Sequence, residues 1–248
     1  MNQTIKLQLN HKSIRKFKTD AIPQEIIDTL VSVAQHTATS NYAQSYSIIS
    51  VTDPIKKKRL AEIGCQPYIE DAAHIFIMIA DQARNAAIVK EELEDTIIFS
   101  SFDKFFIAAT DAILAAQNII IAAESLGIGG VLLGSILNQI DQLNELFEIP
   151  KFAVPVLGIA LGYPDQSPQA KPRLPKHLIH FENIYPKWEN ISLELSEYDK
   201  IVTDYYSARS TNKRIDTFAK MITNWSLNTY QGRIKMLEYI QSKDLIKY

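Results

Sequence analysis

The segment at residues 11–17 gathers cationic and hydrogen-bonding side chains. His11, Lys12 and Arg15 supply positive charge or imidazole nitrogens, and Ser13 supplies a hydroxyl. Binding of a phosphate group requires cationic forks or point charges together with hydroxyl or amide donors. The segment is therefore a candidate anion site, although a run of charge is also typical of a solvated surface.

A second basic segment lies in a Pro-rich stretch, residues 167–175. Each proline there biases the residue before it away from the helical region, so the stretch is expected to be extended. Lys171 and Arg173 are two residues apart and would point to the same side of an extended chain. They could bind one anion together, or both could be solvated.

Two further segments could supply uncharged donors. The loop at residues 37–41 ends in Ser40 and Asn41, and residues 127–135 contain four glycines and Ser135. Glycines allow backbone amides to approach a flat or anionic ligand closely. The glycine-rich segment follows a helical pattern and precedes a strand, the reverse of the Rossmann dinucleotide motif, and it has no Walker lysine. Gly127 and Gly129 are equally explained by a helix end and a tight turn.

Side chains that would carry out chemistry themselves form no known pattern. The histidines show no zinc spacing, so we expect no metal site, and there is no Gly-x-Ser-x-Gly nucleophile elbow. Cys65 is the only cysteine, and we expect an unreactive thiol in a reducing compartment. This pattern fits an enzyme whose cofactor carries the chemistry.

Composition limits the class of partner. The chain has 248 residues, with 26 basic and 28 acidic side chains and a net charge of −2. That balance predicts neither a nucleic acid nor an anionic membrane as a partner. The most apolar stretch, residues 108–126, is interrupted by Asp111, Asn118 and Glu124. Because an Asp near the start of a bilayer span is already costly, we expect a buried helix of a cytoplasmic protein.

Hydrophobic periodicity predicts alternating helices and strands, which favours an α/β or α+β sandwich. Residues 167–175 are interpreted as part of an arm within one fold and not as a domain boundary. The expected strands are 47–53, 74–80, 131–133 and 154–161; the expected helices are 4–10, one opened by Pro23, 56–63, 105–126, 140–147, 193–208 and 216–241.

Five blocks, in this order, resemble the nitroreductase superfamily, and within it the oxygen-insensitive nitroreductase A and NADPH–flavin oxidoreductase group. They are HKSIRKF at 11–17, AQNIIIAAESLGIGGVLLGS at 116–135, GIALGYP at 158–164, KPRLP at 171–175 and YYSARSTNKRIDTF at 205–218. The resemblance runs from about Ile5 to the C-terminus. It implies an α+β sandwich, with a central mixed sheet surrounded by helices, in an intertwined homodimer. Residues 1–248 would form a single domain, with 165–248 as a C-terminal arm.

The resemblance also implies an FMN site shared by both chains. His11, Ser13, Lys171 and Arg173 match residues near the FMN phosphate, and Lys12 stands where Arg is usual. Arg15 matches a cation at the pyrimidine edge of the flavin, and Gln66 and Tyr68 match residues beside the ring. Ser40 and Asn41 match a loop that donates to FMN. Leu133, Gly134 and Ser135 match the segment that faces the ring.

Arg209 and Arg214, with Lys213, match residues that hold the NADPH 2′-phosphate. The implied enzyme is an NADPH-dependent FMN oxidoreductase with a ping-pong cycle, in which hydride passes from NADPH to FMN and electrons then reach free flavin, nitroaromatics or quinones. No side chain is expected to act as a nucleophile. Two alternatives stay open: a non-catalytic flavin-binding protein, and a superfamily member with different reductive chemistry.

Overall fold

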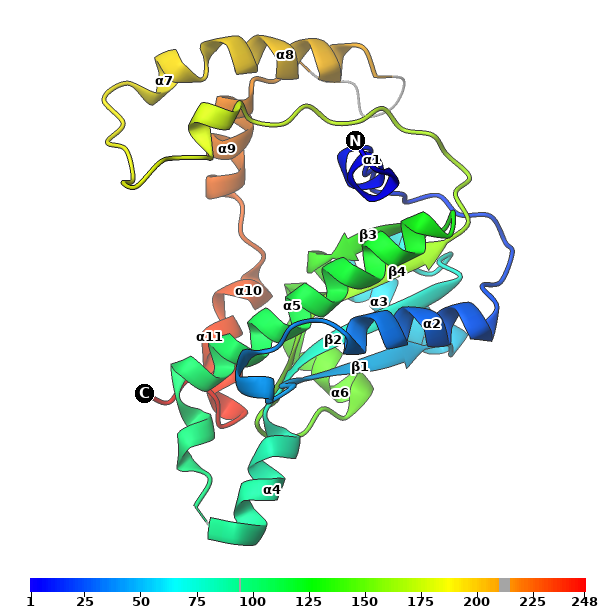
Figure 1. Ribbon diagram of the computed structural model, residues 1–248, viewed down its shortest axis with the longest axis vertical. Coiled ribbons are helices and arrows are strands. Elements are labelled where there is room, and N and C mark those ends of the chain that lie inside the picture. Colours follow the sequence, from blue (N-terminus) through cyan, green and yellow to red (C-terminus); the bar gives the residue numbers. More distant parts are fainter. Residues whose placement is uncertain (94, 210–214) are drawn as a thin grey trace. The chain divides into compact units, whose positions relative to one another are not determined.

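The computed structural model describes residues 1–93, 95–209 and 215–248. Contacts divide these residues into two compact units, 1–168 with 230–248, and 169–229. The expectation of a single domain stays a prediction. Helices predominate around one small sheet (Figure 1).

The first unit is built on a four-stranded sheet with the strand order β1-β2-β4-β3. Its strands are β1 (Tyr46–Val51), β2 (His74–Asp81), β3 (Gly129–Leu133) and β4 (Ala153–Gly162). Its helices are α1 (Gln3–Leu9), α2 (Gln24–Gln35), α3 (Pro54–Gly64), α4 (Ala83–Leu93), α5 (Phe102–Ser125), α6 (Ile140–Phe147), α10 (Gln231–Ile234) and α11 (Met236–Ser242).

The α+β class is confirmed, but the expected mixed sheet differs from the observed one. Every strand pair among the described residues is antiparallel. A parallel pair needs a connection that carries the chain to the opposite end of the sheet. The connection between β1 and β2 instead goes out through α3 and returns through a 3₁₀ turn to the end where β1 finished.

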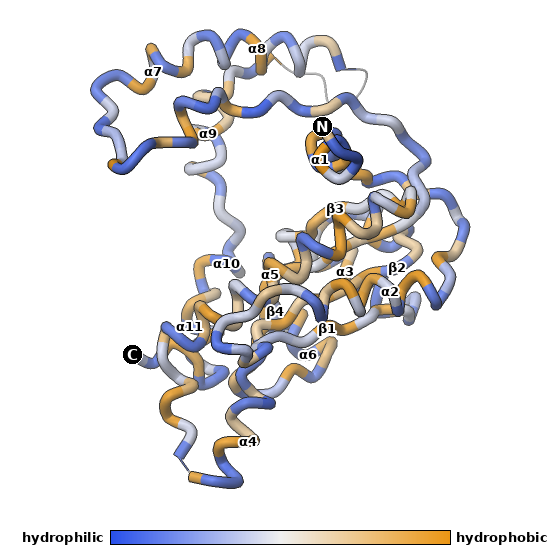
Figure 2. The backbone as a smooth tube through the Cα atoms, in the orientation of Figure 1, coloured by the Kyte–Doolittle hydropathy of each residue, from blue (hydrophilic) through white to orange (hydrophobic). Residues whose placement is uncertain are grey.

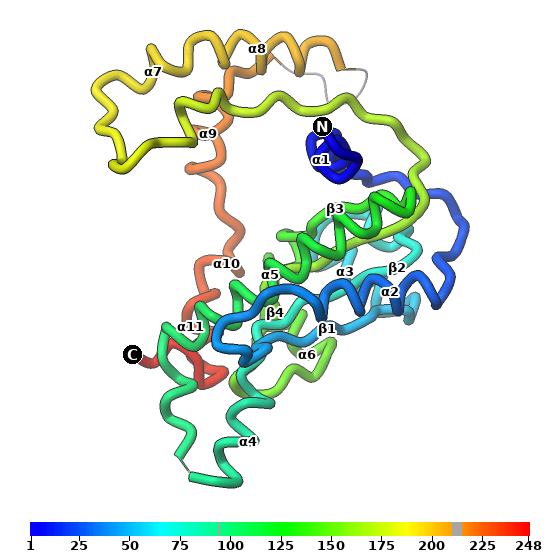
Figure 3. Tube along the Cα trace, viewed as in Figure 1, coloured from blue at the N-terminus to red at the C-terminus, as the bar shows by residue number. Residues whose placement is uncertain are grey.

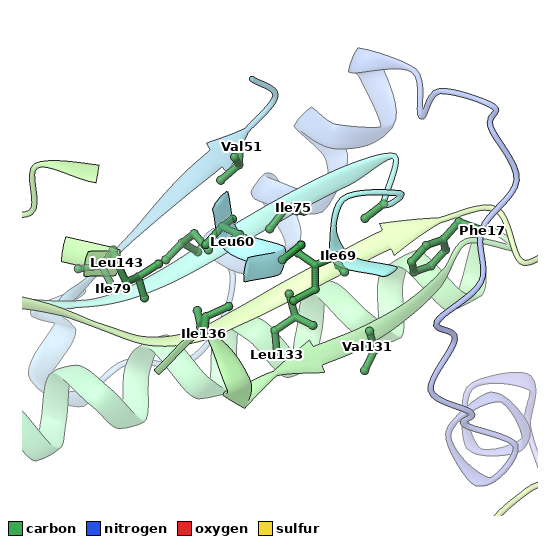
Figure 4. Close-up of a cluster of buried hydrophobic side chains, with 14 of the residues drawn as sticks. Phe17, Val51, Leu60, Ile69, Ile75, Ile79, Val131, Leu133, Ile136 and Leu143 are labelled. Carbon is green, nitrogen blue, oxygen red and sulfur yellow. The ribbon is translucent and has the colours of Figure 1, made fainter. Parts of the chain in front are cut away.

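Strand β2 is the centre of the hydrophobic core, and all of its residues are buried. Ile75, Ile77 and Ile79 face α3 and α6, whereas Phe76 and Met78 face α2 and α5. Figure 4 shows the first of these two clusters, with Leu60, Ile69, Leu133 and Ile136 around the sheet. Burial on both faces explains why β2 is a continuous apolar run and not an alternating one.

Helix α5 covers the other face of the sheet and is apolar along most of its length (Figure 2). It is long and apolar enough to span a bilayer by length and composition, with a mean hydropathy of 1.8 and 39% of that window buried. However, it packs against β1, β2, β3 and β4. We therefore interpret α5 as a core helix of a soluble protein.

The C-terminal segment completes the first unit. Ile240 and Leu245 pack against Ala108 of α5 and Val154 of β4. In Figure 3 this segment, in red, lies beside the first turns of α5. Pro155 stands in β4 where a register shift opposite Met78 and Ile79 marks a β-bulge, one of the places where a strand tolerates proline.

The second unit is helical: η5 (Lys176–Leu178), α7 (Ile191–Glu194), α8 (Ser196–Ser207) and α9 (Phe218–Leu227). Two helix predictions were too long. The expected helix 193–208 begins after a break at Leu195. The expected helix 216–241 is three helices, because Asn228 takes an extended conformation after α9 and α10 ends at Ile234. Helix α4 was not predicted.

Candidate active site

The basic segment 11–17 passes the end of the sheet at which β3 begins and β4 finishes. The Ile14 amide donates to the Gly130 carbonyl at 2.9 Å, and Phe17 forms an isolated bridge with Pro164. Ile14 and Phe17 are buried, whereas Arg15 is exposed. A Cβ at Gly129 would lie 2.6 Å from Ile14 Cγ1. The glycine thus makes room for this segment, which explains part of the glycine-rich sequence without a ligand.

His11 is held by a carboxylate from α5. Its Nδ1 lies 2.6 Å from Oε1 of Glu124, whose side chain is 13% exposed. A carboxylate only accepts hydrogen bonds, so the Nδ1 atom carries a proton and donates it. The other ring nitrogen, Nε2, remains available for a ligand. Lys12 and Ser13 are half-buried beside His11.

Four of the expected FMN residues meet in one cluster: Arg15, Gln66, Tyr68 and Ser135. The Tyr68 hydroxyl donates to Gln66 Oε1 at 2.6 Å, and the Ser135 hydroxyl donates to the same oxygen at 2.8 Å. Burial raises the pKa of Tyr68, and the neighbouring Arg15 guanidinium opposes this rise through its charge and a hydrogen bond. The cluster joins three segments distant in sequence, and no described residue accepts a hydrogen bond from the Gln66 amide nitrogen, which could donate to a ligand.

The segment Leu133–Ser135 is held in place from the C-terminal end of the chain. The Arg233 guanidinium donates to the Gly134 carbonyl, and its Nε donates to Asn138 Oδ1 at 2.9 Å. Leu133 is buried in the core, whereas Gly134 and Ser135 are half-buried. Arg233 therefore fixes the direction of the backbone beside the cluster.

Ser40 and Asn41 lie in a 3₁₀ turn, η1 (Ser40–Tyr42), which follows α2. Asn41 is exposed and takes a left-handed conformation, with φ of 53°. The Ser40 amide donates to Asp111 Oδ1 at 3.1 Å. Among the described residues, no hydrogen bond or ion pair joins this loop to the Arg15–Ser135 cluster.

The remaining cations belong to the second unit. Lys171 and Arg173 are exposed, and Arg173 donates to the Lys171 carbonyl at 3.2 Å. Arg209 is half-buried, with its guanidinium carbon 5.7 Å from the centre of the Tyr205 ring and 5.6 Å from that of Tyr206. Cation–π contacts of this kind fix a guanidinium in place while leaving its donors available. Lys213 and Arg214 lie outside the described residues.

Sequence reasoning missed three residues that position this site: Asp111, Glu124 and Arg233. The first two were noticed only as polar breaks in an apolar helix, and that anomaly is the signal that could have identified them. A buried carboxylate in an apolar helix requires a partner. Arg233 has no comparable signal, because a cation in a short polar segment is ordinary.

Two family models match the chain. The nitroreductase family model matches residues 9–163, and the model of the nitroreductase family C-terminal domain matches residues 171–248. Together they cover nearly the whole chain, including both units described above.

Relatives with similar sequences and structures extend over the full length. The chain is 38% identical over 250 residues to the FMN reductase (NADPH) of Bacillus subtilis, covering all of both chains. It is similar to the solved structure of NfrA1 nitroreductase from B. subtilis, with 37% identity and a TM-score of 0.94, covering 99% of this chain and 100% of that one. NADPH:FMN oxidoreductase from Vibrio harveyi, solved with NAD+, has 33% identity and a TM-score of 0.88, with 100% of each chain covered. The chain therefore belongs to the nitroreductase family.

Proposed function

We propose that this protein is an FMN-dependent NADPH oxidoreductase that acts as a flavin reductase or nitroreductase. The observation that carries the proposal is the cluster of Arg15, Gln66, Tyr68 and Ser135, in which hydrogen bonds join three distant segments. Relatives that match over the whole chain are named FMN reductase (NADPH) and NADPH:FMN oxidoreductase. Both the local chemistry and the full-length similarity support the same activity.

The chain offers a suitable donor set for FMN. A Cβ at Gly134 would meet nothing closer than an Arg233 nitrogen at 3.9 Å, so packing within the chain does not explain a glycine there. Close approach of a flat ring would explain it. Arg15 supplies a cation beside the cluster, and Gln66 supplies an amide donor. These groups suit a ring that gains negative charge on reduction.

Each group of residues has a distinct task. When bound, FMN supplies a ring that accepts hydride from NADPH and then passes electrons to an acceptor. Gln66, Tyr68, Leu133, Gly134 and Ser135 would orient that ring, and Arg15 would stabilise negative charge on it. The protein contributes orientation and electrostatics and needs no nucleophile.

The anionic ends of the two nucleotides require cations. His11, Ser13, Lys171 and Arg173 are the proposed ligands of the FMN phosphate, with Arg173 giving a bidentate contact and Lys171 a point charge. Lys12, Ser40 and Asn41 would donate to other atoms of FMN. Arg209, with Lys213 and Arg214, would bind the NADPH 2′-phosphate. A cation near that group is the general requirement for preferring NADPH over NADH.

We further propose a homodimer in the cytoplasm, with free flavin, nitroaromatics or quinones as electron acceptors. Phe102 and Phe106 at the start of α5 are 55% and 59% exposed and stack on each other at 5.8 Å. Contiguous exposed apolar side chains of this kind mark interfaces. Sedimentation of the protein should therefore give twice the chain mass, and Phe106→Asp should shift the population toward monomer, whereas sedimentation of the unaltered protein as a monomer would exclude the dimer.

Anaerobic stopped-flow mixing tests the activity. FMN-loaded protein is mixed first with NADPH and then, in a separate run, with NADH, while the flavin absorbance is followed. Fast bleaching with NADPH and slow bleaching with NADH would support the reductase and the role of Arg209. Equal rates would keep the reductase and reject the 2′-phosphate assignment. No bleaching by either nucleotide would favour a flavin-binding protein without turnover.

A further inference from the structure

The loop Ser40–Ser45, here called the 40–45 loop, adopts a conformation that its own residues disfavour. Asn41, Tyr42 and Gln44 have φ values of 53°, 58° and 48°. Residues other than glycine rarely take this left-handed conformation, because the Cβ then crowds the neighbouring backbone. Asn tolerates it better than Tyr or Gln does. The loop therefore needs contacts from outside to keep its shape.

Asp111 of α5 supplies the central contact. Its side chain is only 2% exposed and lies in the otherwise apolar surface that α5 turns toward the sheet. Oδ1 accepts the Ser40 amide and Oδ2 accepts the Ser45 amide, both at 3.1 Å. One carboxylate thus holds the two ends of the 40–45 loop. No ion pair to Asp111 occurs among the described residues, so these amides are the donors that offset its burial.

One further side chain holds the 40–45 loop, and another holds Thr37, three residues before it. Asn85 of α4 donates to the Ala43 carbonyl at 3.2 Å and to the Ser45 hydroxyl at 3.1 Å. Asn118 of α5 donates to the Thr37 hydroxyl at 2.8 Å. Asn118 is seven residues, about two helical turns, beyond Asp111, so both lie on one face of α5.

We propose that Asp111 is a positioning residue for cofactor binding: it holds the 40–45 loop in the strained shape that presents Ser40 and Asn41 to FMN. This inference rests on the proposed function, which assigns those two residues to FMN. A carboxylate is required because both of its oxygens accept and both partners donate. An amide at this position would direct an NH₂ group at one of the two backbone N–H groups.

Asp111→Asn is the sharpest variant, because it preserves volume while replacing one acceptor by a donor. We expect FMN to bind about tenfold more weakly, since a hydrogen bond to a charged group is lost in the native loop. Hydrogen exchange at the Ser40 and Ser45 amides should become about tenfold faster in the apoprotein, because a lost partner lowers local protection. Asp103→Asn changes an exposed acid at the start of the same helix and is the matched control.

A double-mutant cycle distinguishes positioning from general destabilisation. FMN dissociation constants are measured for the unaltered protein, Asp111→Asn, Ser40→Ala and the double variant. If Asp111 acts through the 40–45 loop, the double variant should bind FMN little more weakly than Asp111→Asn alone, because the Ser40 contact is already impaired. Independent, fully additive effects would overturn the inference. So would tight FMN binding by Asp111→Asn.

A milder variant covers the case in which Asp111→Asn does not fold. Asn85→Ala releases the 40–45 loop from α4 without placing a donor in the core, and it should weaken FMN binding about threefold. Unchanged FMN affinity in that variant would overturn the inference. Failure of the unaltered protein to bind FMN would instead overturn the proposed function, so the two failures are distinguishable.

Discussion

The two units of the chain differ sharply in how well their side chains are buried. In the first unit β2 is buried at every residue, and α5 closes one face of the sheet. Among the described residues of the second unit, 169–209 and 215–229, only Tyr198, Val202 and Tyr206 are buried. A segment with so small a core cannot supply enough apolar burial to fold alone. The second unit must gain its order from surfaces outside itself.

The exposed side chains of the second unit support that conclusion. Ile184, Tyr185 and Trp225 are 79%, 77% and 74% exposed, and such a density of apolar surface marks an interaction site. The candidate ring-facing residues are therefore carried by the unit with the large core, whereas Lys171 and Arg173, two of the candidate phosphate cations, are carried by the unit with the small one. Substitutions in the two units should therefore change FMN affinity to different extents.

The largest loss of FMN affinity is expected when the two exposed cations of the second unit, Lys171 and Arg173, are removed. The double variant Lys171→Ala, Arg173→Ala should weaken FMN binding about 100-fold, because two charge-assisted contacts to a dianion are lost. Fluorescence titration of the apoprotein measures the dissociation constant. Lys176→Ala, five residues beyond Lys171, is the control. A loss of binding free energy in the control that is half of that in the double variant, and thus equal per charge removed, would mean that only net charge matters.

His74 offers a comparison within the first unit, because it affects stability without touching the candidate site. It opens β2, is 6% exposed and lies 3.2 Å from the Ser50 hydroxyl. Burial and, to a lesser extent, the charge of Lys57 lower the pKa of His74 to about 4. The unfolded chain takes up this proton near pH 6.5, so folded-state stability falls as the pH drops from about 6.5 towards 4.

Replacing His74 should therefore remove part of the acid sensitivity. Between pH 7.5 and 5, His74→Phe should lose about 2 kcal/mol less unfolding free energy than the unaltered protein does. Urea unfolding at fixed protein concentration gives both values. His36→Phe alters an exposed histidine and serves as the control. Identical pH dependence in His74→Phe and the unaltered protein would show that His74 titrates normally.

A change of about tenfold in the KM for NADPH is expected when Arg209 is replaced. This variant tests whether the second unit distinguishes NADPH from NADH. Arg209→Ala should raise the KM for NADPH about tenfold and leave that for NADH unchanged, because only NADPH carries the 2′-phosphate. The KM of Arg209→Lys for NADPH should lie between those of the unaltered protein and Arg209→Ala. This variant keeps the charge but loses the planar stacking on Tyr205 and Tyr206. An equal rise for both nucleotides would assign Arg209 a structural role.

The helices and strands that could be predicted from the sequence are those whose burial produces a recognisable run of apolar residues. Strand β2 was expected at 74–80 and runs from His74 to Asp81, because a fully buried strand is a continuous apolar run. Helix α5 was expected at 105–126 and runs from Phe102 to Ser125 for a similar reason. Helix α4 was missed because only Ala86 in it is buried.

The contacts that hold the site could not be predicted in the same way. Asp111 and Ser40 are 71 residues apart, and Gly134 and Arg233 are 99 apart. No local pattern encodes such pairs, since they exist only once the sheet and α5 have packed. The resemblance to the family predicted Gln66, Tyr68 and Ser135 as site residues. Only the structure shows that the Tyr68 and Ser135 hydroxyls both donate to Gln66 Oε1.

The smallest loss of FMN affinity is expected from single variants in the cluster of Arg15, Gln66, Tyr68 and Ser135, where two hydroxyl groups donate to the same oxygen of Gln66. Tyr68→Phe and Ser135→Ala should each weaken FMN binding about threefold or less, because the remaining hydroxyl still holds Gln66 Oε1. The double variant should weaken it about 30-fold, more than the product of the single effects, since the Gln66 amide is then free to rotate. Fluorescence titration of the four proteins gives the coupling. Additive effects would show that each hydroxyl contacts FMN separately and that the cluster is not a single positioning unit.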